Sequence, residues 1–169
     1  MDTVDVIRDI LQKAYQIEVD GYTFYSMTAD RADKPAVREL FEKLAADEVE
    51  HQRYLREVMR KVDGEGPAAF RVKLRMPGMA DFSKSVFTDA FREQARGAAF
   101  EVAVLSIGMQ LESNAIATFS RAASSAAETE VRDFYRFLAD WEKQHLDALQ
   151  KLHEAVRTDF WERAGFSPF

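Results

Sequence analysis

Cysteine is absent from the 169-residue sequence, and this absence excludes several kinds of functional site. Without thiols there can be no disulfide, no thiolate zinc site, no iron–sulfur cluster and no rubredoxin-type iron centre. A chain without cysteine suits a reducing compartment. Its first residues are acidic and lack the basic and apolar segments of a signal peptide, so we expect a cytoplasmic protein.

Glycine, proline, excess positive charge and long apolar runs are also scarce. Seven glycines and four prolines in the whole chain favour helix over sheet. A formal net charge of −6 argues against a nucleic-acid partner, which would select a basic surface. No uninterrupted apolar run approaches the roughly 18 residues that span a bilayer, so no membrane partner is expected.

Apolar residues recur at alternating spacings of three and four, which predicts four long helices in one all-α domain covering residues 1–169. We expect the helices at about 4–32, 36–62, 97–126 and 128–157. Residues 63–96 are longer than a bundle turn requires and predict a crossover connection, with a short helix near 86–94. Three basic residues in this crossover, Arg71, Lys73 and Arg75, are interpreted as a solvated connector rather than a docking site for an acidic partner.

Two Glu-x-x-His pairs stand out because the chain has only three histidines. Glu48 and His51 form the first pair, and Glu142 and His145 form the second, 94 positions later. Each pair replaces apolar residues in the inward stripe of its predicted helix. At a spacing of three, both side chains of a pair can reach one metal ion. The third histidine, His153, is expected at the surface.

A further glutamate precedes each pair by 30 positions: Glu18 in the first predicted helix and Glu112 in the third. Both interrupt an apolar stripe, where an unpaired carboxylate is costly to bury. Taken alone, Glu18 could equally be a surface glutamate. Glu101 occupies the position that Ile7 has in the first half; we expect it to escape to the end of the bundle and not to bind metal.

The spacing of these residues indicates that the second half of the chain repeats the first, with identities on the inward faces. We interpret the fold as two duplicated helical hairpins joined by the crossover. Two single glutamates and two Glu-x-x-His pairs on four helices are the ligand arrangement of ferritin-like di-iron and di-manganese proteins. Four carboxylates balance two divalent cations, and mixed oxygen and imidazole donors favour iron or manganese over a closed zinc site.

On these residues the chain resembles the ferritin-like superfamily and, within it, the rubrerythrin group, from the first helix through the fourth. The resemblance implies two iron ions, with manganese or a mixed pair as alternatives. It implies that Glu48 and Glu142 bridge the metals, that Glu18 and Glu112 are terminal ligands, and that each metal has one histidine. It also implies that the hydroxyl of Tyr25 lies beside the metals; the alternative is a core aromatic whose hydroxyl is satisfied elsewhere.

The chain departs from the rubrerythrin pattern in two ways. Rubrerythrins typically carry a rubredoxin domain with four cysteines, so here the electrons are expected from an external donor protein or a small reductant. They also usually carry a glutamate three residues after the third-helix ligand, where this chain has Ala115. That substitution makes the predicted site more like that of bacterioferritin.

The expected function is a di-iron redox protein that reacts with hydrogen peroxide or O₂, as a rubrerythrin-like peroxidase in defence against oxidative stress. The alternatives are a ferroxidase or iron-handling protein, a ferritin-like hydroxylase, or a non-catalytic metal-binding bundle. A homodimer is expected from the resemblance, and the crossover would allow helix pairs to be exchanged between subunits. The aromatic residues near the C-terminus, Phe160 and Trp161 among them, are interpreted as a cap on the bundle or a subunit contact.

Overall fold

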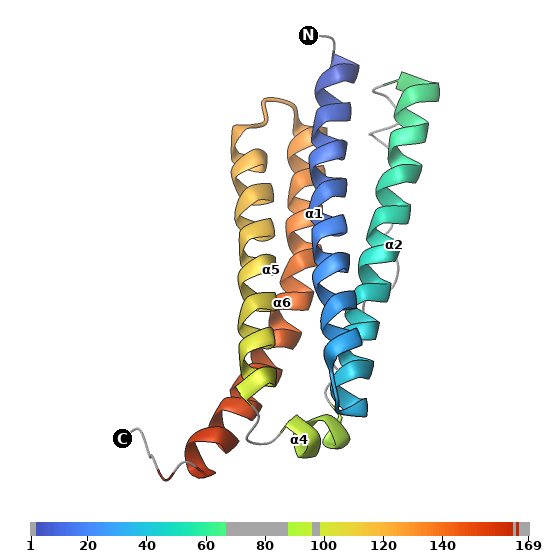
Figure 1. Cartoon of the computed structure of the whole chain (residues 1–169). Coiled ribbons are helices and arrows are strands. Elements are labelled where there is room, and N and C mark those ends of the chain that lie inside the picture. The colour runs from blue at the N-terminus through green and yellow to red at the C-terminus, as the bar shows by residue number, and fades with distance from the viewer. Residues whose placement is uncertain (1–2, 67–87, 96–98, 164, 166–169) are drawn as a thin grey trace.

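A computed structural model describes residues 3–66, 88–95, 99–163 and 165, and over these residues the chain is all-α (Figure 1). The helices are α1 (Thr3–Arg31), α2 (Pro35–Glu65), α4 (Asp89–Ala95), α5 (Ala99–Ser125) and α6 (Thr129–Arg163). α1 packs chiefly against α2 and α5 against α6, so the bundle consists of two helical hairpins. The predicted all-α bundle of four long helices is confirmed.

The helix ends follow local chemistry. Pro35 occupies the first turn of α2, where its missing amide hydrogen costs nothing, and Gly66 ends the helix with a φ of 73°. The sequence placed the end of α2 at residue 62 and that of α6 at residue 157, whereas the structure continues them to Glu65 and Arg163. The extension of α2, Asp63 to Glu65, contains no apolar residue, so hydrophobic periodicity alone ended that helix too early.

The short helix α4 connects the two hairpins at one end of the bundle (Figure 1). The hydroxyl of Thr88 accepts a hydrogen bond from the Phe91 amide, at 3.1 Å, and so caps the helix. Gln94 then accepts a hydrogen bond from the Ala36 amide at 2.8 Å, which satisfies a free donor in the first turn of α2. The remaining crossover residues, including Arg71, Lys73 and Arg75, lie outside the described part of the chain, as do the side chains of Phe160 and Trp161.

A layer of polar side chains divides the apolar core into two clusters. One cluster, nearer α4, includes Phe41, Leu105 and Leu149. The other includes Leu11, Phe119 and Trp141. The two clusters have no buried residue in common, and the buried glutamates and histidines other than Glu101 lie between them along the helices. The polar layer therefore crosses the middle of the bundle.

Glu101 lies at the end of the bundle, in the first turn of α5 and beside the turn between α1 and α2. Its side chain is nevertheless buried, at only 4% exposed, which the sequence did not predict. Lys34, in the turn between α1 and α2, lies 3.1 Å from its carboxylate and neutralises it. Periodicity within one helix could not reveal a partner that the other hairpin supplies. Glu101 belongs to no cluster of candidate metal ligands, as expected.

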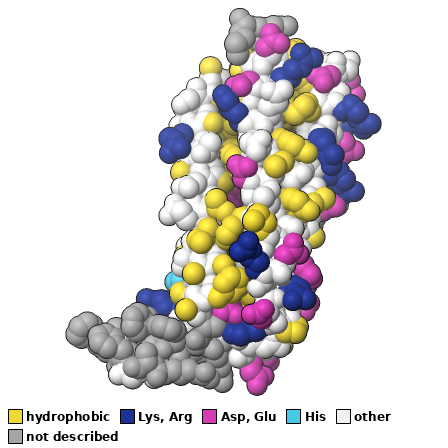
Figure 2. All heavy atoms as spheres, in the orientation of Figure 1, with side chains coloured by type: hydrophobic (Ala, Val, Ile, Leu, Met, Phe, Trp, Pro, Cys, Tyr) yellow, Lys and Arg dark blue, Asp and Glu magenta, His cyan; other side chains and the backbone are white. Residues whose placement is uncertain are grey.

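Helix α5 is apolar on average, and of the described helices it alone is long and hydrophobic enough to cross a membrane. Serines, a glutamine and glutamates interrupt its apolar residues, so a search for an unbroken run does not detect it. The helix packs against α6 and buries two glutamates, which is the environment of a core helix in a bundle. Hydrophobic side chains also gather on the surface over α1 and α5 (Figure 2).

Candidate metal centre

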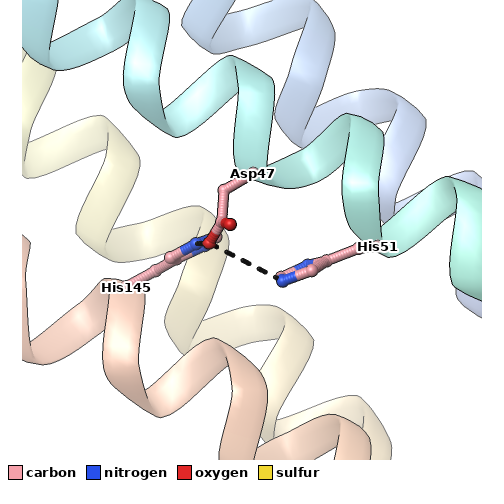
Figure 3. A group of neighbouring side chains, drawn as sticks. All are labelled: Asp47, His51 and His145. Atoms are coloured by element: carbon pink, nitrogen blue, oxygen red, sulfur yellow. Dashed lines mark hydrogen bonds and ion pairs between the residues drawn. The ribbon is translucent and has the colours of Figure 1, made fainter. Parts of the chain in front are cut away.

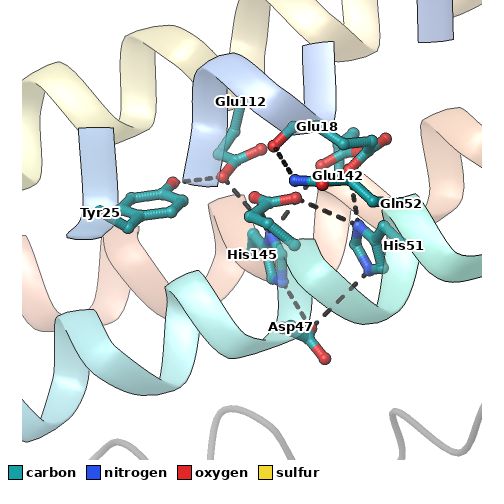
Figure 4. Close-up of polar contacts among 9 residues, drawn as sticks. Glu18, Tyr25, Asp47, His51, Gln52, Glu112, Glu142 and His145 are labelled. Carbon is teal, nitrogen blue, oxygen red and sulfur yellow. Dashed lines mark hydrogen bonds and ion pairs between the residues drawn. The ribbon is translucent and has the colours of Figure 1, made fainter. Parts of the chain in front are cut away.

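The structure brings together all six residues that the sequence predicts as metal ligands. Four helices contribute them: Glu18 from α1, Glu48 and His51 from α2, Glu112 from α5, and Glu142 and His145 from α6 (Figure 4). Every one is at most 4% exposed. Helical spacing places each Glu-x-x-His pair on one inward face, and the antiparallel packing within each hairpin brings the single glutamate alongside it.

These donors form two overlapping groups in which the candidate ligand atoms all lie within 4.8 Å of one another. The first group contains Glu18, His51, Glu48 and Glu142, and the second contains Glu112, His145, Glu48 and Glu142. Glu48 and Glu142 belong to both groups, whereas the other four residues belong to one each. The arrangement therefore offers two adjacent cation positions with two shared carboxylates.

The Nδ1 atoms of both histidines face the carboxylates. In His51 this atom lies 2.8 Å from Oε2 of Glu18 and 3.3 Å from Oε2 of Glu48. In His145 it lies 3.4 Å from an oxygen of Glu48 and 3.4 Å from one of Glu112. Each ring thus directs one nitrogen into the cluster and the other, Nε2, towards the opposite side.

Asp47 lies on that opposite side and was not predicted from the sequence (Figure 3). Its Oδ2 atom is 2.7 Å from Nε2 of His145 and 3.8 Å from Nε2 of His51. A hydrogen bond from Nε2–H of His145 to Asp47 holds the ring so that Nδ1 faces the carboxylates and is the nitrogen that would bind a metal. A usable signal was present, because Asp47 precedes His51 by four residues and so shares its helix face.

His51 is held by a different contact. The indole ring of Trp141 stacks on its imidazole, with ring centroids 4.0 Å apart and planes 6° apart. Nε2 of His51 has no hydrogen-bond partner among the residues that the structure describes. Stacking therefore fixes the plane of this ring but does not determine which nitrogen carries the proton.

The predicted position of Tyr25 beside the cluster matches the structure. Tyr25 is fully buried, and its hydroxyl donates a hydrogen bond to Glu112 across the interface between the hairpins (Figure 4). Burial raises the pKa of Tyr25 well above its ordinary value, and the charge on Glu112 raises it further. The phenol therefore stays protonated and acts as a hydrogen-bond donor.

The carboxylates experience opposite electrostatic environments. Burial, with the nearby charge of Glu48, raises the pKa of Glu18 to about 8. Burial likewise raises the pKa of Glu48, and that of Glu142 well above its usual range. Burial also acts on Glu112, but hydrogen bonds from His145, Glu142 and Tyr25 outweigh it and lower the pKa of this carboxyl. Without a cation, part of the cluster is stabilised by holding protons.

A pair of divalent cations fits this donor set. Buried carboxylate oxygens on Glu18, Glu48 and Glu142 have no hydrogen-bond partner within the described residues. Such orphaned acceptors are costly in a protein interior unless a cation or proton satisfies them. Gly21 leaves room for the carboxylate of Glu48. A Cβ at this position would lie 2.9 Å from Oε1 of Glu48, so any other residue would displace that carboxylate.

The remaining sequence predictions concern residues outside the cluster. Ala115 is buried and adds no donor where rubrerythrins usually have a glutamate. His153, expected at the surface, is half-buried on α6 and lies 3.0 Å from the hydroxyl of Ser106 on α5.

Comparison with known proteins gives one line of support. The family model described as rubrerythrin matches residues 9–153, which include every residue of the cluster. Neither the curated proteins nor the solved structures contain a significant match.

Proposed function

Since the chain belongs to the rubrerythrin family, we propose that it is a di-iron carboxylate protein that reduces hydrogen peroxide or O₂. The observation that supports this most directly is the pair of overlapping donor groups with Glu48 and Glu142 in common. Four carboxylates and two imidazoles match the preference of iron and manganese for hard oxygen donors with some nitrogen. We propose iron as the metal, with manganese as the alternative.

When two ferrous ions are bound, they supply the two electrons that, with two protons, convert hydrogen peroxide to two molecules of water. The chain's own residues provide the environment for this chemistry. Glu18, Glu48, Glu112 and Glu142 would hold the ions, and their negative charges balance two divalent cations. His51 and His145 would each contribute Nδ1. Burial of the whole set excludes bulk water.

Residues around the ligands prepare them for binding. Asp47 holds the ring of His145 with Nδ1 towards the carboxylates, and Tyr25 keeps the carboxylate of Glu112 oriented and charged. We further propose that a separate donor protein or a small reductant returns the electrons, since these 169 residues contain no cysteine to hold a rubredoxin-type iron. We expect this exchange in the cytoplasm, as part of defence against oxidative stress.

A ferroxidase is the second candidate, and Ala115 favours it. This buried side chain has no donor atom, so nothing at this position follows the metals as they change oxidation state. A centre of six ligands that oxidises incoming ferrous ions with O₂ would need only the residues already described.

We also propose that the chain forms a homodimer. Large hydrophobic side chains remain exposed on α1 and α5, with Tyr22 at 40%, Met27 at 53%, Phe100 at 41% and Ile107 at 49% (Figure 2). A second copy of the chain would cover this surface, and analytical ultracentrifugation would measure the mass in solution. A monomer at micromolar concentration would overturn this part of the proposal.

The test of function is an anaerobic Fe(II) titration, followed by mixing the loaded protein separately with hydrogen peroxide and with air-saturated buffer. Two irons per chain and faster oxidation by peroxide, with repeated turnover when a reductant is supplied, would support the peroxidase. Faster oxidation by O₂ would favour the ferroxidase. The double variant Glu48→Ala and His51→Ala should lose bound iron and keep its helical circular dichroism. Unchanged iron content in that variant would overturn the proposal.

A further inference from the structure

The two halves of the metal centre have the same ligands but different neighbours. A shift of 94 positions relates Glu18 to Glu112 and His51 to His145, and it also relates Asp47 to Trp141 and Tyr25 to Phe119. The ligands are therefore conserved between the repeats, whereas the residues that hold them are not. The two cation positions, one at Glu18 and His51 and the other at Glu112 and His145, are chemically different sites.

The histidines show the first difference. His145 lies at full hydrogen-bond distance from Asp47, 2.7 Å, whereas His51 lies 3.8 Å from the same oxygen. A carboxylate behind a metal-binding histidine fixes the ring and strengthens its free nitrogen as a donor. Trp141 occupies the position from which a second aspartate would have served His51, and it stacks on the ring instead.

The surroundings of Nδ1, the nitrogen that would bind a cation, also differ between the two rings. In His51, Nδ1 is engaged with Glu18 at 2.8 Å. That contact has to break before Nδ1 can bind a cation. In His145, Nε2 is held by Asp47 at 2.7 Å, and Nδ1 lies 3.4 Å from oxygens of Glu48 and Glu112. The second hairpin's histidine is thus preorganised and the first hairpin's is not.

The terminal glutamates repeat this pattern. Glu112 accepts the hydroxyl of Tyr25, which holds one of its oxygens in place. The residue equivalent to Tyr25 is Phe119, a buried side chain with no hydroxyl to offer Glu18. Two independent contacts therefore preorganise the Glu112 and His145 position, whereas the Glu18 and His51 position has only the 3.8 Å contact between His51 and Asp47 and no equivalent of the Tyr25 hydroxyl.

We infer that the centre fills in a fixed order: the position of Glu112 and His145 binds the first divalent cation tightly, and that of Glu18 and His51 binds the second more weakly and exchanges it faster. This inference rests on the proposed di-metal function and specifies how that site is assembled.

Titration of the apoprotein with Mn(II) tests the order of filling, since Mn(II) accepts the same donors and is stable in air. Calorimetry gives the affinities, and electron paramagnetic resonance separates isolated ions from spin-coupled pairs. At one equivalent, ordered filling gives almost entirely isolated ions. Two equal and independent positions, each half filled, would place about half of the bound Mn(II) in pairs by simple statistics. That result, or a still larger share of pairs, would overturn the inference.

A matched pair of variants distinguishes unequal positions from repulsion between two equal ones. Glu112→Gln should weaken the first binding step by about tenfold or more, whereas Glu18→Gln should leave the first step within about twofold and weaken the second. If the positions were equal, the first ion would choose the intact one in either variant, and both variants would behave alike. Equal behaviour overturns the inference while leaving the proposed function standing.

Two further variants test the residues that make the two cation positions unequal, Asp47 beside His145 and Phe119 at the position equivalent to Tyr25. Asp47→Asn keeps the size of the side chain but removes its charge, and it should weaken the first step about tenfold to a hundredfold with little effect on the second. Phe119→Tyr adds a hydroxyl at the position equivalent to Tyr25, and it should strengthen the second step. If Asp47→Asn weakened the second binding step and left the first unchanged, the inferred order of filling would be wrong. Absence of any Mn(II) binding would overturn the proposed function together with the inference.

Discussion

The first hairpin, α1 with α2, and the second, α5 with α6, differ most in what each does for the other. Tyr25 on α1 and Asp47 on α2 both contact ligands of the second hairpin, Glu112 and His145. In return, the second hairpin stacks the ring of Trp141 on His51 and places Nδ1 of His145 3.4 Å from an oxygen of Glu48. Duplication of a hairpin therefore supplies the ligands, but contacts between unlike copies determine how firmly each ligand is held.

The same comparison appears in the electrostatics of equivalent carboxyls. The pKa of Glu18 is raised to about 8, chiefly by burial, whereas the pKa of Glu112 is lowered by hydrogen bonds that include one from Tyr25. The environment of Glu18 thus favours the protonated acid, whereas that of the equivalent Glu112 favours the carboxylate. Substitutions at equivalent positions of the two hairpins should therefore change stability or metal affinity by different amounts.

The largest effect should appear in the pH dependence of the apoprotein. Because the folded-state pKa of Glu18 lies above its unfolded value, the stability linked to this group is present below about pH 4.5 and is lost as the pH rises towards 8. His145, whose pKa is also raised, acts in the same direction. Urea unfolding should show a fall on the order of 3 kcal/mol between pH 5 and pH 8.

Two matched variants test whether the fall in stability between pH 5 and pH 8 arises from Glu18 and not from Glu112. Glu18→Gln should flatten the curve above pH 5. Glu112→Gln should keep the fall but remove the loss of stability on the acid side, because a carboxyl with a lowered pKa stabilises the fold only while it is ionised. Identical curves for the two variants would contradict the opposite shifts described here.

A smaller effect, on the free energy of unfolding, is expected at Glu101, which is equivalent to Ile7 in the first hairpin. Lys34→Ala would leave the buried carboxylate of Glu101 without its cation and should lower the free energy of unfolding by about 1 to 2 kcal/mol, since the exposure of Lys34 weakens the pair. Glu101→Ile makes the halves alike and should be neutral or stabilising. Thermal denaturation would measure both, and a destabilised Glu101→Ile protein would count against this account.

The next effect concerns Gly21 and its counterpart Ala115. Gly21→Ala would place a Cβ 2.9 Å from Oε1 of Glu48 and displace a carboxylate common to both donor groups. We expect about a tenfold loss of Mn(II) affinity by calorimetry. Ala115→Gly is the matched control: it should lower helix stability by about 1 kcal/mol and leave affinity within about twofold. Equal losses of affinity would show that crowding at Glu48 is not the cause.

The smallest effect is expected where the halves differ without consequence for the site. His153 is equivalent to Met59, and its contact with Ser106 is at the surface of the bundle. His153→Met should change stability by less than about 0.5 kcal/mol and leave metal binding unaltered. A measurable change in Mn(II) stoichiometry would make His153 part of the site.

The sequence alone was sufficient for the helices and for the six clustered donors, because both follow from periodicity within a helix. Glu48 and His51 replace apolar residues in a regular stripe, and the second copy of the spacing removes the ambiguity of the first. The position of each ligand along its helix therefore needed no knowledge of packing.

What periodicity could not supply were contacts between helices. Asp47 is next to a ligand and is part of a charged surface in the sequence, so nothing in α2 alone shows that it reaches His145 from α6. The burial of Glu101 was missed for the same reason, since its partner Lys34 is in a turn of the other hairpin. The assignment of Tyr25 came from resemblance, and its hydrogen bond to Glu112 required the assembled bundle.

The polar layer between the two apolar clusters also determines how the helices align along the bundle axis. If one helix slid along its neighbours by a single turn, about 5.4 Å, it would move a carboxylate or imidazole into an apolar cluster and leave its former partners unpaired. Apolar contacts alone would tolerate such a shift far better. The charged layer therefore fixes the axial alignment of the helices, even before any cation binds.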